Sequence, residues 1–323
     1  MDNLYLEKRK ASLQSISVVV PCYNEEEVIT ETYKRLKAVL NKVGIPYEII
    51  FVDDGSKDNT WGLLSELSDN DKCVKAIKLA RNHGHQFALT CGLDQSKGEV
   101  VLIIDADLQD PPELLEEMLE KWKEGYYVIY GKRIARDGES RSKRFFAFSF
   151  YRIISKISKI EIPRDTGDFR LVDRKALDVL LKMREPQRFI RGMVAWIGFP
   201  QTPILYHRQE RFAGSTKYPF KKSLLLAFDA ITSFSYVPLR LTTYLGMFFS
   251  FFSFIYFIVV IVLKFKGVNF SGYTSLMGAI LMLGGIQLIM LGIIGEYVGR
   301  IFQQGQKRPL YIIQDIKGEP FEK

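Results

Sequence analysis

Two carboxylates one residue apart, Asp105 and Asp107, follow a short apolar run at Val100–Ile104. Such a run is typical of a buried strand, so both acids emerge where that strand ends. Adjacent carboxylates repel each other unless a cation lies between them, and Mg²⁺ or Mn²⁺ accepts carboxylate oxygens and completes its shell with substrate phosphates. A surface turn with solvated acids is the alternative. The longer motif DADLQDPP, with DDGS at 53–56 one unit earlier, favours the metal site.

A second set of residues suits phosphate groups. Lys132, Arg133 and Arg136 cluster after another strand-like run, at Tyr126–Tyr130. The chain has no GxGxxG after its first predicted strand and no GxxxxGK[ST] motif, which argues against dinucleotide oxidoreductases and P-loop NTPases. A bound diphosphate would therefore be neutralised by metal and by Arg or Lys side chains.

The elements that would position these residues alternate between strand-like and helix-like segments. The predicted strands are Ser15–Val20, Tyr47–Val52, Val74–Leu79, Val100–Ile104 and Tyr126–Tyr130. We expect Asn24 to cap one helix, Asp58 or Thr60 to start the next, and Pro111 and Pro112 to begin a third that runs to about Lys123. This order predicts an α/β domain with a mainly parallel sheet covered by helices on both faces, and ligands bind at the carboxyl ends of such strands.

The C-terminal third differs in composition. Leu241–Leu263 contains no charged residue, and neither does Thr274–Gly295, so each could cross a hydrocarbon core of about 30 Å as a helix. Two such runs so close together predict a transmembrane hairpin rather than buried soluble helices. Basic residues flank its outer ends (Lys217, Lys221, Lys222, Arg240, Arg300, Lys307 and Arg308), whereas the loop 264–273 holds only Lys264 and Lys266. We expect both ends, the domain 1–230 and the tail 296–323 to lie in the cytoplasm, at the inner or plasma membrane.

Two further segments have helical spacing of apolar residues with basic residues between them, near 145–160 and 217–231. An ordinary surface helix is the alternative for each. Beside two membrane spans, helices that lie in the lipid interface are the better interpretation.

Net charge, cysteines, histidines and the N-terminal residues give further information about partners and compartment. The net charge is +8, but its basic clusters lie beside the spans and the phosphate-type motifs, which favours anionic lipid and diphosphate over nucleic acid. Cys22, Cys73 and Cys91 have no metal-ligand spacing and predict free thiols in a reducing compartment. The three histidines form no zinc motif, so structural roles are expected for them. Residues 1–14 are polar and charged, which predicts no signal peptide.

Six motifs in one order resemble the inverting family 2 glycosyltransferases of GT-A fold. They are PCYNEEE (21–27), VDDGSKDNT (52–60), DADLQDPPE (105–113), DTGDFRLVDR (165–174), RFIRGMVAWIGF (188–199) and RFAGSTKY (211–218). The similarity continues through ITSFSYVPLRL (231–241), the second span and KRPLYII (307–313). The branch that it resembles contains dolichyl-phosphate mannose synthases and bactoprenol (undecaprenyl-phosphate) glucosyltransferases.

The resemblance implies roles for individual residues. Nucleotide-sugar binding would fall to Pro21, Tyr23, Glu25, Asp53, Asp54 and Asp105. The metal, Mg²⁺ or Mn²⁺, would be held by Asp105, Asp107 and Gln109. The acceptor phosphate or the diphosphate would contact Arg133, Arg144, Arg191, Arg211 and Lys217. Asp168 would be the catalytic base, and Asp107, as a metal ligand, would be the second catalytic residue. Positioning the sugar or an arginine is the alternative role for Asp168, and an N-cap the structural one.

The function implied is transfer of a hexose, glucose, from a UDP-sugar to polyprenyl phosphate with inversion. Alternatives in the same fold would transfer mannose or an aminosugar of the GlcNAc or 4-amino-arabinose type. A non-enzyme alternative is a membrane scaffold that keeps an inactive transferase domain. The small residues Gly278, Ala279, Gly284, Gly285 and Gly292 permit close helix approach, and with the family resemblance they predict a homo-oligomer, a tetramer.

Overall fold

The computed structural model describes residues 9, 13–134, 166–207, 237–266, 272–319 and 321. Arg144, Arg211, Lys217 and the two predicted interfacial helices lie outside the described residues. The chain divides into two compact units: Met1–Ser155, Lys159–Pro219 and Pro309–Lys323 form one, and Lys156–Ser158 and Phe220–Arg308 form the other.

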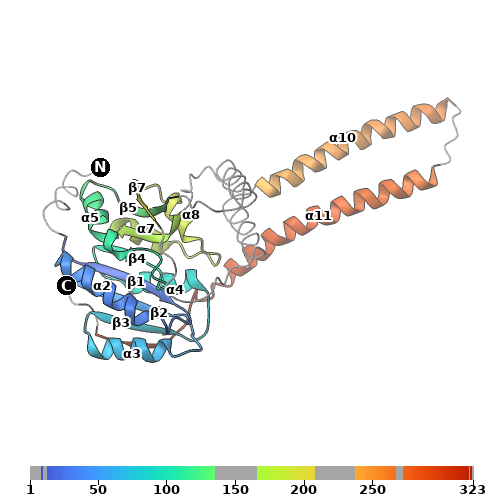
Figure 1. The fold of residues 1–323 in the computed structure, drawn as a ribbon. Coiled ribbons are helices and arrows are strands. Elements are labelled where there is room, and N and C mark those ends of the chain that lie inside the picture. Colours follow the sequence, from blue (N-terminus) through green and yellow to red (C-terminus); the bar gives the residue numbers. More distant parts are fainter. Residues whose placement is uncertain are drawn as a thin grey trace. The chain divides into compact units, whose positions relative to one another are not determined.

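The first unit is built on one sheet. Its described strands lie in the order β7-β5-β6-β4-β1-β2-β3-β8 (Figure 1). Their bounds are β1 (Ile16–Cys22), β2 (Tyr47–Asp53), β3 (Val74–Leu79), β4 (Val100–Ile103), β5 (Val128–Arg133), β6 (Thr166–Asp173), β7 (Gln201–Tyr206) and β8 (Ile313–Lys317). All five strands predicted from the sequence are present, with ends shifted by a few residues.

The pairing makes this a mixed sheet with mostly parallel strands. β4, β1, β2 and β3 pair in parallel, and so do β5 and β7. β6 is antiparallel to both of its neighbours, β4 and β5, and β8 is antiparallel to β3 at the edge. The predicted α/β class is therefore confirmed, and two antiparallel strands are added to it. Because β8 comes from Ile313–Lys317, part of the segment expected to be a tail completes the sheet.

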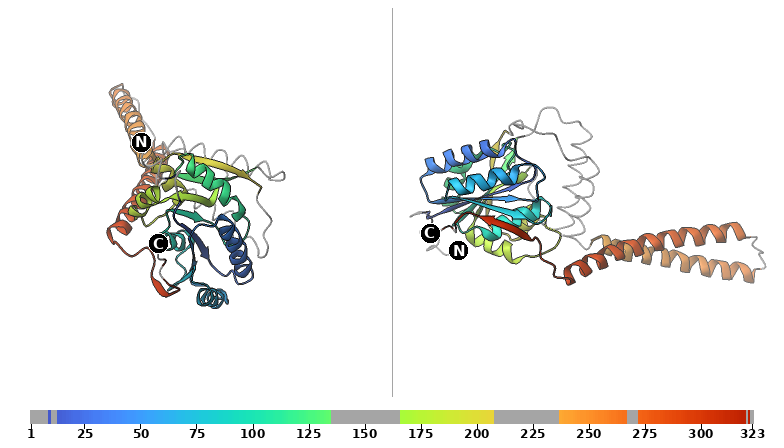
Figure 2. Two further views of the ribbon diagram at one scale, coloured as in Figure 1. Left: turned by 90° about the vertical axis from the view of Figure 1, so that its left-hand side faces the viewer. Right: turned by 90° about the horizontal axis from the view of Figure 1, so that it is seen from below.

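Helices cover both faces of the sheet (Figure 2). On one face, α2 (Ile29–Val43), α3 (Thr60–Asn70) and α5 (Leu115–Lys123) bury Leu36, Leu64 and Trp122 against strand residues such as Val18 and Phe51. On the other face, α4 (His85–Gln95) packs Ala88 and Cys91 against Ile50, Val52 and Ile77. The alternation of neighbouring strand residues between the two cores is the two-residue period of a strand covered on both sides.

Of the three predicted helix starts, that at Pro111 and Pro112 is present as a 3₁₀ turn at Pro112–Leu114 that leads into α5, and the other two differ in outcome. Asp58 Oδ1 accepts hydrogen bonds from Thr60 N at 3.1 Å and Thr60 Oγ1 at 2.6 Å where α3 begins, as expected. The prediction that Asn24 caps a helix is wrong, because α2 begins at Ile29. Asn24 instead has a left-handed backbone (φ 53°), and its Oδ1 accepts from Lys57 N at 2.9 Å. It therefore fixes the turn after β1 to the turn after β2.

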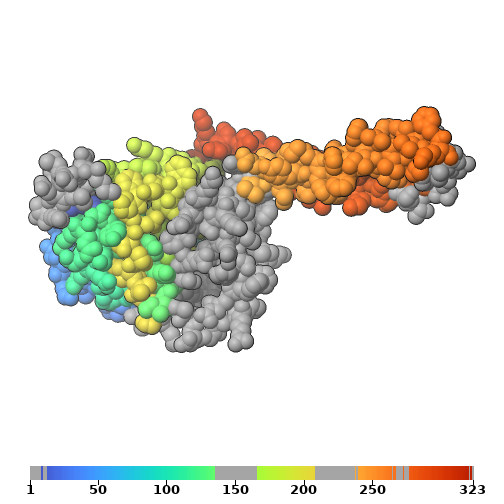
Figure 3. All heavy atoms as spheres, turned by 90° about the horizontal axis from the view of Figure 1, so that it is seen from above, coloured from blue at the N-terminus to red at the C-terminus, as the bar shows by residue number. Residues whose placement is uncertain are grey.

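The second unit holds two long apolar helices, α10 (Val237–Phe265) and α11 (Tyr273–Gly305), which lie beside each other in Figures 1 and 2. Side chains of α10 form one face of this pair in Figure 3. By length and composition, Leu239–Leu263 and Leu276–Gly305 could each cross a membrane. Both helices extend beyond the predicted spans 241–263 and 274–295.

Candidate active site

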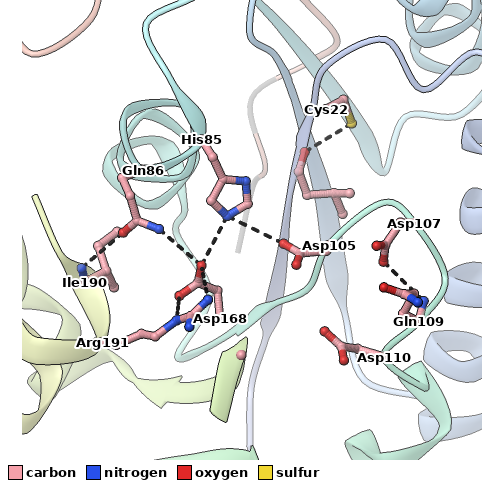
Figure 4. A network of polar contacts seen from close by, with 12 residues as sticks. Cys22, His85, Gln86, Asp105, Asp107, Gln109, Asp110, Asp168, Ile190 and Arg191 are labelled. Atoms are coloured by element: carbon pink, nitrogen blue, oxygen red, sulfur yellow. Dashed lines mark hydrogen bonds and ion pairs between the residues drawn. The ribbon is translucent and has the colours of Figure 1, made fainter. Parts of the chain in front are cut away.

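The carboxyl ends of β1, β2 and β4 place the predicted polar motifs at one edge of the sheet. β1 and β2 pair in register up to Cys22 and Asp53, and β4 ends two residues before Asp105. Parallel strands bring their carboxyl ends together, so the turns that follow them converge. Figure 4 shows the side chains gathered there.

Asp105 lies near three other carboxylates, those of Asp107, Asp110 and Asp168. Its side chain is 27% exposed, and its Oδ1 has no hydrogen-bond partner among the described residues, with His85 Nε2 at 3.6 Å. Burial raises the pKa of Asp105 to about 6, against the opposing charge of His85, and the charges of Asp168, Asp110 and Asp107 add to the rise. A carboxylate in such surroundings is stabilised by an added cation.

The turn after Asp105 arranges the other two residues expected to hold metal. Asp107 Oδ1 accepts a hydrogen bond from Gln109 N at 3.2 Å, and Leu108 between them has a left-handed backbone (φ 57°). Nowhere in the described part of the chain do three or more His, Cys, Asp or Glu side chains converge on one point as a metal site. Mg²⁺ and Mn²⁺ do not require such a cage, because one or two carboxylates with water and substrate phosphates suffice. The residues present therefore fit a divalent ion that binds together with a phosphate ligand.

Asp168 enters the same site from β6, whose antiparallel insertion between β4 and β5 brings it beside Asp105. The side chain is almost completely buried, and four hydrogen bonds from described residues hold it, with Arg170 Nη2 also lying 3.8 Å from Oδ1. Arg191 Nε donates to Oδ1 at 2.8 Å, and Oδ2 is contacted by Arg191 Nη2 at 3.3 Å, Gln86 Nε2 at 3.1 Å and His85 Nε2 at 3.2 Å. Burial alone would raise the pKa of Asp168, but the charge of Arg191 and the hydrogen bonds from His85 and Arg191 hold it well below its usual range. Asp168 is therefore ionised throughout the neutral range.

His85 and Gln86 are site residues that the sequence reasoning missed. His85 Nε2 lies between Asp168 Oδ2 and Asp105 Oδ1, at 3.2 Å and 3.6 Å. Burial lowers the pKa of His85, yet the hydrogen bond to Asp168 and the charges of Asp105 and Asp168 raise it to about 9, so its ring is a cation at neutral pH. The only available signal was the segment RNHGHQ directly after a predicted strand, where polar residues reach the ligand edge of the sheet.

The two acids of DDGS have different surroundings. Asp53 is completely buried; its Oδ1 accepts from Ser56 N at 3.0 Å, while its Oδ2 has no hydrogen-bond partner among the described residues. Asp54 uses both oxygens on the backbone of the next loop, accepting from His83 N at 2.7 Å and Gly84 N at 2.9 Å. Asp53 thus retains an acceptor for a ligand donor, whereas Asp54 holds the loop that leads into α4.

The other residues expected at the nucleotide surround the turn after β1. Pro21 is buried within β1, and Tyr23 and Glu25 are half-buried in the turn that follows. Glu25 N donates to Thr60 Oγ1 at 2.9 Å, which fixes this turn against the start of α3.

Arg133 and Arg191 are the predicted phosphate-binding residues that the structure describes. Arg133 ends β5; its Nε donates to Tyr206 Oη at 3.1 Å and its Nη2 lies 3.6 Å from Asp110 Oδ1. Tyr206 Oη in turn donates to Asp110 Oδ1. A Cβ added to Gly167 would lie 2.7 Å from Arg133 Nη2, so glycine there allows the guanidinium to pass close to β6. Arg191, on α8 (Ile190–Trp196), is one-third exposed beside Asp168.

Comparison with known proteins adds relatives along almost the whole chain. Residues 17–181 match the model of Glycosyl transferase family 2, and residues 237–301 match that of the GtrB C-terminal hairpin. A bactoprenol glucosyl transferase of Shigella phage SfV is 40% identical over 303 residues, which cover 94% of this chain and 99% of the phage protein. An uncharacterized glycosyltransferase of Bacillus subtilis (strain 168), YkcC, is 50% identical over 303 residues, 94% of each chain.

Solved structures resemble the chain more distantly. The crystal structure of glucosyl-3-phosphoglycerate synthase from Mycobacterium tuberculosis in complex with Mn²⁺, uridine-diphosphate and phosphoglyceric acid is similar with a TM-score of 0.48 and 17% identity. The similarity covers 70% of this chain and 79% of that one.

Proposed function

The chain belongs to glycosyl transferase family 2, in its bactoprenol glucosyltransferase branch, and we propose that it transfers glucose from UDP-glucose to polyprenyl (undecaprenyl) phosphate with inversion. Its first unit has the GT-A-like sheet of the family. The observation that carries the proposal is the similarity to bactoprenol glucosyl transferases, which covers 94% of the chain, together with the match of its C-terminal part to the GtrB hairpin. A lipid acceptor explains why a hairpin long enough to cross a membrane accompanies the catalytic domain.

The nucleotide-sugar would occupy the edge formed by the turns after β1, β2 and β4. The Oδ2 atom of Asp53 has room in its hydrogen bonding for one N–H donor, and a uracil ring offers one. Tyr23 and Glu25 lie in the adjoining turn, and Pro21 shapes its start. We assign Asp54 an indirect role, because both of its oxygens are used by His83 and Gly84.

The leaving diphosphate and the acceptor phosphate both need positive charge. Mg²⁺ or Mn²⁺ held by Asp105 and Asp107, with Gln109 beside them, would supply it for the diphosphate. Arg133 and Arg191 would bind phosphate oxygens, joined by Arg144, Arg211 and Lys217 from outside the described residues. Charge-assisted hydrogen bonds of this kind contribute about 1.5–3 kcal/mol each.

Asp168 would face the attacking phosphate. A phosphate monoester has its second pKa near ~6, so the acceptor arrives largely as a dianion and little proton removal is needed. A carboxylate whose pKa lies far below the usual range is a weak base, but it keeps its negative charge at neutral pH. Because both of its oxygens already accept hydrogen bonds, we assign Asp168 the role of holding Arg191 and His85 in place beside the attacking phosphate.

The test of this function is the chemical nature of the product. Purified full-length protein given UDP-glucose labelled in the sugar, together with undecaprenyl phosphate, should transfer label to the organic phase. A monophosphate-linked glycoside should release that label in mild acid. GDP-mannose and UDP-GlcNAc in parallel reactions identify the donor. Label found only in a water-soluble product, or only as hydrolysed sugar, would contradict the proposal.

The membrane arrangement is a separate proposal. We infer that the catalytic domain and the tail lie in the cytoplasm, because basic residues flank the outer ends of the two helices and are few in the loop between them. Reporter fusions at Lys323 and within the 264–273 loop should report cytoplasm and exterior respectively. A fusion at Lys323 that is exported would overturn this topology.

The oligomer is also a proposal. Among the glycines of α11, Gly278, Gly285, Gly292 and Gly299 recur every seven residues, and a Cβ added to any of them would meet no atom within 4 Å. A face of small residues on a membrane helix allows another helix to approach closely, which favours a homo-oligomer. That the oligomer is a tetramer is what the family resemblance implies. Light scattering in mild detergent should give four times the protein mass of the chain, and a monomer would contradict the inference.

A further inference from the structure

The amide side chain of Gln86, at the start of α4, touches both the carboxylate of Asp168 and the start of α8. We propose that Gln86 is a positioning residue, which orients Asp168 and Arg191 relative to each other and to the parallel strands. The inference rests on the proposed function, because it takes Asp168 to lie at the reacting centre.

Both ends of the Gln86 amide are engaged. Nε2 donates to Asp168 Oδ2 at 3.1 Å, and Oε1 accepts from Ile190 N at 3.1 Å (Figure 4). A flipped amide would set oxygen against the carboxylate and NH₂ against the backbone N–H, so both partners select the same orientation. Ile190 N is one of the first-turn N–H groups of α8 that no carbonyl within the helix can satisfy.

These contacts join Gln86, Asp168 and the start of α8 in a closed circuit of hydrogen bonds. Arg191 follows Ile190 directly and donates to Asp168 Oδ1 at 2.8 Å, opposite the oxygen that Gln86 contacts. Gln86, Asp168, Arg191 and the backbone of α8 therefore fix one another. A carboxylate held from both oxygens has little freedom to rotate, which is what an orienting group requires.

The position of Gln86 is itself fixed by the sheet. Asp54, directly after β2, accepts hydrogen bonds from His83 N and Gly84 N, and Gly84 has a backbone φ of 106°. A Cβ on Gly55 would lie 2.6 Å from the carbonyl carbon of Arg81, so the two loops touch closely. The start of α4 is thus held against the turn after β2, where the nucleoside would bind. Through Gln86 it links that turn to Asp168 and Arg191.

The neighbouring His85 is less suitable for testing this idea. Its Nε2 contacts Asp105 as well as Asp168, so a change there would also disturb the proposed metal ligand. Gln86 can be altered without that complication.

Two substitutions separate positioning from simple structural support. Gln86→Leu removes both contacts, whereas Gln86→Glu keeps an acceptor for Ile190 N but sets a carboxylate against Asp168. If Gln86 only anchors α8, the glutamate variant should behave as wild type. If it positions Asp168, both variants should lose about tenfold to a hundredfold in kcat while KM for the UDP-sugar stays within about twofold, since small misplacements of reacting groups have effects of this size.

Gln95→Leu is the matched control. Gln95 ends the same helix, and its Oε1 accepts from Lys75 Nζ at 2.9 Å, on the far side from Asp168. It should keep wild-type kcat, and thermal unfolding of the three variants in detergent should show whether each is folded. Wild-type kcat in folded Gln86→Glu, or equal losses in Gln95→Leu, would overturn the positioning role. Absence of transfer to polyprenyl phosphate by the wild-type protein would instead refute the proposed function.

Discussion

Asp168→Asn should lower kcat for sugar transfer by roughly 10²-fold or more, because it releases Arg191 and His85, and misplacement of reacting groups by about 1 Å has an effect of this size. Asparagine preserves the shape of the side chain but removes the charge that holds His85 and Arg191. With its NH₂ group in place of Oδ2, asparagine would face the donor groups of His85 Nε2 and Gln86 Nε2, and those two hydrogen bonds could not form. The measurement is single-turnover transfer of labelled sugar at saturating UDP-sugar and lipid acceptor. Full activity would remove Asp168 from the reacting centre.

Another acid on the same strand provides the control. Asp173, at the other end of β6, is fully buried, lies 2.6 Å from Arg9 Nη2 and accepts from Trp122 Nε1 at 2.7 Å. Asp173→Asn leaves Arg9 without its counter-charge, so the free energy of unfolding should fall by about 3–5 kcal/mol. Its kcat, measured below the unfolding transition, should remain that of wild type. The pair of variants therefore distinguishes loss of a reacting group from loss of fold.

The parallel part of the sheet was predictable because its signal is local. Short runs rich in apolar residues marked β1 to β5, all but β3 ended by proline, glycine or an acid, and the acids after β4 lie at the ligand edge where they were expected. Parallel strands buried on both faces read as continuous apolar runs, which are easy to recognise in a sequence.

β6 could not be recognised in the same way. It contains Asp168, Arg170 and Asp173, yet all of its residues are buried. Arg170 is accommodated because its guanidinium donates to the carbonyl oxygens of Asp168 at 3.2 Å and Gly167 at 3.0 Å. Charged residues in a buried strand conceal its pattern, and only their tertiary partners make it stable. The insertion of β6 between β4 and β5, which brings Asp168 to Asp105, is likewise a long-range pairing.

The contacts of the site divide in the same way, into local ones that the sequence predicts and long-range ones that it does not. That Asp105 and Asp107 would follow β4 was predicted from neighbouring residues. That Asp54 would hold a loop, and that His85 and Gln86 would approach Asp168, depends on segments far apart in the sequence. No motif of the chain contains both partners of any of these contacts.

Removal of divalent metal should abolish transfer. The expected loss with EDTA is roughly 10³-fold or more, because metal stabilisation of a leaving group supplies several kcal/mol and each 1.4 kcal/mol is about tenfold in rate. Mg²⁺ or Mn²⁺ in excess of the chelator should restore the activity. Unchanged transfer after exhaustive chelation would show that side chains alone neutralise the leaving diphosphate.

Asp107→Ala and Asp110→Asn then locate the ion. Both acids belong to DADLQDPP, but Asp107 is partly exposed beside Asp105, whereas Asp110 is buried and contacts Tyr206 and Arg133. Mn²⁺ binding in the presence of UDP can be followed by electron paramagnetic resonance. Its affinity should fall at least tenfold in Asp107→Ala, which corresponds to a loss of about 1.4 kcal/mol or more, and should stay near wild type in Asp110→Asn.

The pH dependence of metal binding is a further test of the site. Because Asp105 carries a pKa of about 6 within a group of four acids, a bound cation should also lower that pKa. Apparent Mn²⁺ affinity should therefore fall as the pH drops below about 6, since protons and metal then compete for the same carboxylate. Wild-type Mn²⁺ affinity and full transfer activity in Asp107→Ala at saturating donor would remove this residue from the metal site.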